Sequence, residues 1–120
     1  MALAVGGLWF SYINEAPDGN PNDGVFNVIL KPNGVDFDGK HVRSASAVDH
    51  NGTYTPASGG KPDLITFTEP DPDDPMCIFT YTGELKTVGK DIITEKGKRH
   101  RECSGLDKVG DDDWVGTHTT

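Results

Sequence analysis

The stretch LITFT (residues 64–68), EPDPDDP (69–75), M (76) and CIFTYTG (77–83) decides the fold. In the first run Ile65 and Phe67 alternate with threonines, which is the period of a β-strand with one dry face and one wet face. The third run is rich in the β-branched and aromatic residues that favour strands. The two runs predict an antiparallel hairpin in which Phe67 and Phe79 are core residues. Three prolines and four carboxylates make residues 69–75 a rigid, acidic, outward-facing tip.

Turn signals elsewhere extend this pattern along the chain. They are Pro32-Asn33-Gly34, His50-Asn51-Gly52 and Ser58-Gly59-Gly60, in which Asn and Gly accept the positive φ of tight turns. Further strands are expected at 8–13, 25–30, 35 onward and 92–95, and a closing strand is expected around Trp114. Trp9 and Phe10 should point to opposite faces of the first strand.

The spacing of these runs predicts the fold class. Seven to nine strands at intervals of 8 to 12 residues indicate one all-β domain over residues 1–120. We expect a small antiparallel meander barrel, with a sandwich as the alternative. Gly and Pro together number 23 of 120 residues, so a long helix is not expected.

Charge and composition restrict the function classes. The formal net charge of −8 repels polyphosphates and anionic lipids, so we expect neither nucleic acid nor membrane as a partner. The first residues are apolar but lack a basic segment, which predicts no signal peptide and a cytoplasmic location, with non-classical secretion as the alternative. In that setting Cys77 and Cys103 are expected to be reduced structural thiols, and whether the two pair stays open. The oligomeric state stays open, a homodimer being one option.

Several short motifs follow one another in the order found in calycin-type barrels. They are Phe37-Asp38-Gly39, Asp49 through Tyr54, Ile65-Thr66-Phe67, Phe79 through Leu85, and Ile93 through Gly97-Lys98. Over residues 35 to 98 the chain therefore resembles the lipocalin and avidin-like group, and Gly7-Leu8-Trp9 approximates the Gly-x-Trp motif of the first lipocalin strand. The resemblance implies a meander barrel and carries over no ligand residue.

Aromatic and amide side chains suggest a ligand site at the barrel mouth. Sugar recognition needs an apolar face for stacking and polar groups for hydroxyls. We therefore predict a small molecule or glycan as the partner, without a cofactor. The predicted binding residues are Trp9, Asn20, Asn22, Asp23, Tyr54, Tyr81 and Trp114.

The only cationic block, residues 96–101, contrasts with the acidic remainder of the chain. Lys98, Arg99 and Arg101 could bind an anion or an acidic partner. Alternatively, these charges protect an edge strand from pairing with another sheet.

Two other function classes stay open. In a small enzyme such as a cyclase, isomerase or hydrolase, an interior Asp49, His50, Glu84 or Glu95 would serve as acid or base, although each is expected at the surface. In a protein-binding module or inhibitor, residues 69–75 would be the presented loop. No metal site is predicted, because the calcium-like spacing Asp18-x-Asn20-x-Asn22 is interrupted by Pro21 and the histidines are scattered.

Overall fold

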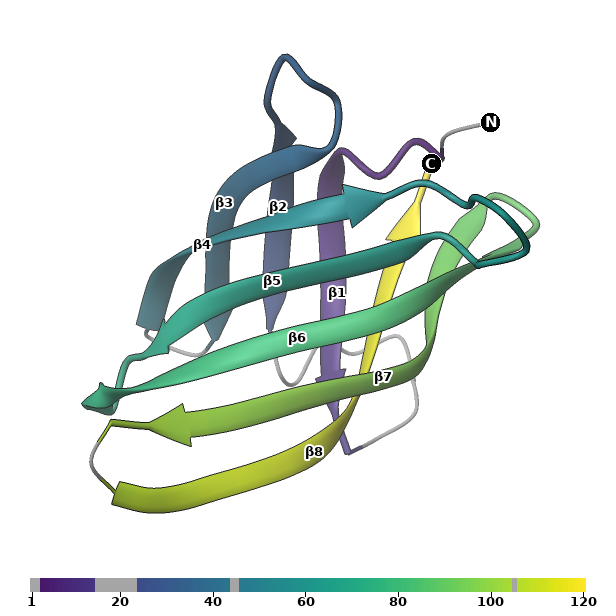
Figure 1. The fold of residues 1–120 in the computed structure, drawn as a ribbon. Coiled ribbons are helices and arrows are strands. Elements are labelled where there is room, and N and C mark those ends of the chain that lie inside the picture. Colours follow the sequence, from purple (N-terminus) through teal and green to yellow (C-terminus); the bar gives the residue numbers. More distant parts are fainter. Residues whose placement is uncertain (1–2, 15–23, 44–45, 105) are drawn as a thin grey trace.

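The computed structural model describes residues 3–14, 24–43, 46–104 and 106–120, without the side chains of 106–109. Within these ranges eight strands close into one antiparallel barrel (Figure 1). The strands are β1 (Gly7–Ile13), β2 (Val25–Leu30), β3 (Asp36–Arg43), β4 (Ser46–Thr55), β5 (Leu64–Asp71), β6 (Asp74–Val88), β7 (Asp91–Cys103) and β8 (Leu106–Thr119). Each strand pairs with the next, and β8 pairs with β1. The predicted all-β meander barrel is confirmed, and the described residues contain no helix that could span a membrane.

The barrel has two ends with different contents. The N- and C-terminal segments, the β2–β3 turn and the β6–β7 turn lie at one end, which we call the terminal end (Figure 1). The last residues of β1, β3, β5 and β7 and the first residues of β2, β4, β6 and β8 lie at the other end, which we call the disulfide end. The name refers to a bond between Cys77 and Cys103.

Two of the three predicted turns are found where the sequence places them. Asn33 Oδ1 accepts hydrogen bonds from the backbone N–H groups of Val35 and Asp36, and Gly34 takes a φ of 76°. Ser58 and Lys61 form a bridge around Gly59 and Gly60, both at positive φ. These bonds fix the β2–β3 and β4–β5 connections.

The third predicted turn is wrong, because His50, Asn51 and Gly52 lie inside β4. Gly52 is needed there for close packing, not for a turn. A Cβ atom at this position would collide with the Thr66 carbonyl oxygen and the Phe67 side chain. The run from Asp36 to Val48 is thus divided between β3 and β4.

The prediction that residues 69–75 form an outward-facing acidic tip is also wrong. β5 continues to Asp71 and β6 begins at Asp74, so only residues 72 and 73 turn the chain. Glu69 and Asp71 are buried on the same face as Ile65 and Phe67. Residues 69–75 therefore do not form the loop that a protein-binding module was expected to present.

Cys77 and Cys103 form a disulfide, which corrects the prediction of two free thiols. They are 26 residues apart in sequence, but the β6–β7 register places them directly opposite each other. The sequence separation does not reveal that the two cysteines are neighbours; the β6–β7 register does.

Aromatic rings fill the middle of the barrel. Phe67, which is 1% exposed, stacks on Tyr81 with ring centroids 4.5 Å apart and lies 4.9 Å from Phe26. Phe79 is also buried, so both predicted core phenylalanines are confirmed. The other large side chains of the core are Trp9, Phe37, Tyr54, Ile65, Leu85, Ile92 and Trp114.

Candidate ligand site at the disulfide end

The inner face of the barrel changes from apolar to charged toward the disulfide end. Along β5 the inward positions are Ile65, Phe67, Glu69 and Asp71. The charged side chains of the described residues that point inward here are Arg43, Glu69, Asp71, Arg99, Arg101 and Asp112, and we call them the charged layer. They belong to strands β3, β5, β7 and β8, and the acidic and basic members are equal in number.

Glu69 is the most deeply buried member of the charged layer, with its side chain 0% exposed. The phenol of Tyr81 donates a hydrogen bond to Glu69 Oε1 at 2.7 Å. His41 Nδ1 lies 2.9 Å from Oε2, and Arg43 Nη2 lies 3.3 Å from Oε1. Both carboxylate oxygens are thus held by side chains from β6, which neighbours β5, and from β3, which lies beyond β4.

These contacts set the ionisation of the cluster. Burial alone would raise the pKa of Glu69, but the hydrogen bonds from His41 and Tyr81 and the positive charge of Arg43 outweigh it. The pKa of Glu69 therefore lies below its usual range. Burial and the nearby Glu69 charge raise the pKa of Tyr81. At neutral pH the interior consequently holds a carboxylate hydrogen-bonded by a neutral phenol.

Arg43 and Arg99 lie over the ring of Phe79, at the outer limit of the cluster around Glu69. The Arg99 guanidinium carbon lies 4.4 Å from the centroid of the Phe79 ring, and that of Arg43 lies 5.4 Å from it. Arg99 is also paired with Asp112, its Nη2 lying 2.6 Å from Oδ2. Arg101 Nε lies 3.0 Å from Asp71 Oδ2. Two of the arginines thus lie over the Phe79 ring, and Arg99 and Arg101 are each paired with a carboxylate.

A second polar feature lies deeper, where two imidazoles face the aromatic core. His50 stands opposite Gly39, and its Nε2 lies 2.8 Å from the backbone carbonyl oxygen of Asn27. A Cβ atom at Gly39 would collide with both groups, so glycine is required for this approach. Burial lowers the pKa of His50.

Two of the three buried histidines each keep one nitrogen without a hydrogen-bond partner in the described part of the chain, His41 Nε2 and His50 Nδ1. Both imidazoles pack against Phe26 and Phe67. Unpaired polar atoms inside an aromatic core are costly and call for an explanation.

The predicted ligand-binding aromatics are placed in the core, and their polar groups are held by the protein. Trp9 Nε1 donates to the Val5 carbonyl oxygen and Trp114 Nε1 donates to Ser11 Oγ, each at 2.9 Å. The phenol of Tyr54 bonds to Asp63, near the terminal end. Among these aromatic residues, Tyr81 is the one whose polar group contacts the charged layer, through its hydrogen bond to Glu69.

The predicted residues Asn20, Asn22 and Asp23, and the calcium-like spacing around them, lie outside the described residues.

The three predicted anion-binding residues divide between the two faces of β7. Lys98 is on the outer face, where its Nζ lies 2.5 Å from Asp113 Oδ1. Arg99 and Arg101 belong to the charged layer. β7 pairs with both β6 and β8, so the interpretation of these cations as guards of an edge strand is wrong.

The fully buried acid inside the barrel is Glu69, which is not among the four acid–base candidates predicted from the sequence. Those candidates are Asp49, His50, Glu84 and Glu95. Asp49 and Glu95 are exposed and Glu84 is partly exposed; they are paired with Lys40, Lys86 and Lys96 respectively. The expected surface position of His50 is wrong, because this side chain is buried. Sequence reasoning missed Glu69, His41 and Arg43. Continuing the alternation of Ile65 and Phe67 by one more step would have found Glu69.

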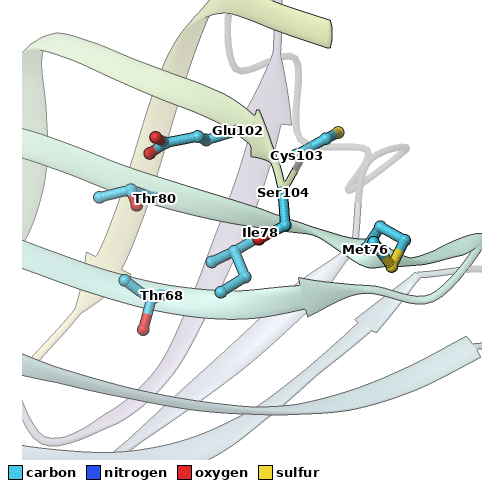
Figure 2. A pocket seen from close by; sticks show the side chains of 7 residues that line it. All are labelled: Thr68, Met76, Ile78, Thr80, Glu102, Cys103 and Ser104. Atoms are coloured by element: carbon cyan, nitrogen blue, oxygen red, sulfur yellow. The ribbon is translucent and has the colours of Figure 1, made fainter. Parts of the chain in front are cut away.

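A hollow of about 420 Å³ lies on the outer face of β5, β6 and β7. Figure 2 shows Thr68, Thr80 and Glu102 along it, with Ile78 at its centre and Met76 near the β5–β6 turn. It is separated from the charged layer by the sheet, because outward and inward residues alternate along each strand.

Comparison with known proteins supports the architecture. No family model matches the sequence, and no curated protein matches it. Among solved structures, apo shwanavidin is similar, with a TM-score of 0.63 and 12% identity over 100% of this chain and 98% of that one. Rhizavidin is similar with a TM-score of 0.59 and 12% identity over 98% of this chain and 84% of that one. The chain therefore has the fold of an avidin-type barrel, in agreement with the resemblance to calycin-type barrels seen in its motifs.

Proposed function

We propose that this protein binds a small, neutral, hydrogen-bonding molecule at the charged layer of the barrel. The observation that carries the proposal is the Glu69 carboxylate, fully buried and held by His41, Tyr81 and Arg43. A buried ion pair is often no more stabilising than a well-packed apolar cluster. Such a cluster, with a shifted pKa, at one end of a barrel is a candidate binding site.

The charges of the site favour a neutral ligand. The six described side chains of the charged layer are three arginines and three carboxylates, so the formal charges of this set cancel. A guanidinium has five N–H donors and a carboxylate can accept about four hydrogen bonds, so both retain capacity for a ligand. A molecule that carries both donors and acceptors on a compact ring suits a site that offers both guanidinium and carboxylate groups; a monosaccharide and a cyclic urea are examples. The likeness to avidin-type barrels supports binding inside the barrel.

Calorimetric titration tests the proposal with two ligand sets. One set contains monosaccharides, and the other contains the neutral cyclic ureas biotin methyl ester and 2-imidazolidinone. We expect one member to bind the wild-type protein and to bind Arg43→Gln and Glu69→Gln about tenfold more weakly, since a hydrogen bond to a charged group is worth about 1.5 to 3 kcal/mol. Lys98→Gln, on the outer face, is the matched control and should bind normally.

Two results would overturn this function. One is the absence of binding by both sets to a folded wild-type barrel. The other is binding that Arg43→Gln and Glu69→Gln leave unchanged.

The unpartnered His41 Nε2 favours a second candidate, acid–base catalysis. Glu69 orients Nδ1 of the same ring, and a carboxylate that orients an imidazole is a common arrangement for a general base. The two candidates differ in one measurement. A catalyst would convert a bound ligand in a reaction that His41→Gln abolishes, whereas a binding protein returns the ligand unchanged.

A further inference from the structure

A group of three metal-ligating side chains lies at the disulfide end, apart from the Glu69 cluster. Asp74, Cys77 and Cys103 each offer one ligand atom, and these atoms lie within 4.8 Å of one another. Cys77 and Cys103 are 1% and 5% exposed, and Asp74 is partly buried. The two cysteines come from paired strands, so the barrel itself holds them together.

We propose that reduction of the Cys77–Cys103 disulfide converts this group into a binding site for Zn²⁺. Thiolate and carboxylate are both zinc ligands, with bond lengths of about 2.3 Å and about 2.0 to 2.2 Å. Tetrahedral coordination at these lengths places ligand atoms roughly 3.5 Å apart, which side-chain rotation and small strand movements can reach. Three protein ligands leave the fourth position to water.

Local hydrogen bonds prepare Asp74 for this role. Its Oδ1 accepts a hydrogen bond from the Met76 backbone N–H at 3.1 Å, and Oδ2 lies 3.7 Å from Arg101 Nη2. Ser104 N–H donates to the Met76 carbonyl oxygen at 2.9 Å, which ties the ends of β6 and β7 together independently of the disulfide.

The chemistry balances with a dithiol as the reductant. The dithiol is oxidised to its own disulfide and transfers two electrons and two protons to the Cys77–Cys103 bond, which breaks to give two thiols. Zn²⁺ then displaces the two thiol protons into solvent. An oxidant that accepts two electrons, such as a glutathione disulfide, restores the bond and releases the metal.

Zinc titration of the full chain tests the proposal. The protein is reduced with a dithiol, freed of reductant without air, and titrated with Zn²⁺ against a chromophoric chelator. We expect one Zn²⁺ per reduced chain and weaker binding by the oxidised chain. Asp74→Asn should weaken binding by about tenfold or more, since loss of even an outer-shell partner costs that much. Asp73→Asn, at the exposed neighbouring position, should bind like the wild type.

Cys77→Ser and Cys103→Ser should each lose tight binding, and Co²⁺ should give the visible absorption of a tetrahedral thiolate site in the wild type alone. Binding that survives in the double serine variant would overturn the proposal, as would a folded, reduced wild type that binds no zinc. If circular dichroism shows that reduction unfolds the barrel, Zn²⁺ must restore the β spectrum, and failure to restore it would also overturn the proposal.

Discussion

Replacement of Phe67 by alanine should remove the centre of the aromatic core. The ring is 1% exposed and lies within 6.5 Å, centroid to centroid, of the rings of Phe26, Phe37, His41, His50, Tyr81 and Trp114. Lost burial of the ring costs about 2 kcal/mol. The strands on both sides are paired and prevent collapse, so a residual cavity of roughly 90 Å³ at 24 cal/mol per Å³ adds about 2 kcal/mol. The expected loss in the free energy of unfolding is therefore about 4 kcal/mol.

Urea denaturation followed by tryptophan fluorescence measures this loss. The matched control is Ile78→Ala on the outer face of the adjacent strand, where the side chain is 53% exposed. The control should lose about 1 kcal/mol or less, because most of that side chain stays in water. Equal losses for the two variants would refute the β5 register, because a slip of one residue would exchange the buried and exposed faces.

Two further predictions concern the buried polar groups. Because the folded pKa of Glu69 is depressed, its stabilisation is present above its ordinary pKa of 4.5 and is lost as the pH falls below that value through the folded pKa. Glu69→Gln should therefore cost about 2 kcal/mol at neutral pH and much less in acid, as measured by urea denaturation; a pH-independent cost would contradict an ionised Glu69. Burial lowers the folded pKa of His50 below the ordinary 6.5, so the unfolded chain binds the proton first and the free energy of unfolding should fall as the pH drops from about 7.5 to about 5.5. His50→Gln should reduce that pH dependence, and an unchanged slope would show that other groups cause it.

The sequence predicted the barrel because its strongest signals are local. Alternation around Phe67 and the Pro32-Asn33-Gly34 turn depend on a few adjacent residues, and both are present in the structure. The single misplaced turn, at His50-Asn51-Gly52, shows the limit of such signals. Glycine serves turns and close strand packing alike, and only the neighbouring strand distinguishes them.

The candidate site was harder to predict because it depends on register. Prolines 70 and 72 interrupt the usual strand pattern, and β5 passes Pro70 only with a register shift against β6. Glu69 precedes this shift and keeps the regular inward alternation, while Asp71 follows the shift and is still buried. Likewise, the opposition of Cys77 and Cys103 follows from the β6–β7 pairing, which no local motif encodes.

The central claim, that a ligand binds at the charged layer inside the barrel, is tested most directly by amide chemical-shift mapping. A ¹⁵N-labelled sample is titrated with the monosaccharide or cyclic urea that calorimetry selects. We expect shifts at Arg43, Glu69, Phe79 and Arg99, while Tyr54 and Ile92, toward the terminal end, stay unchanged. Shifts confined to the terminal end, or to the outer face around Thr68 and Thr80, would contradict the claim.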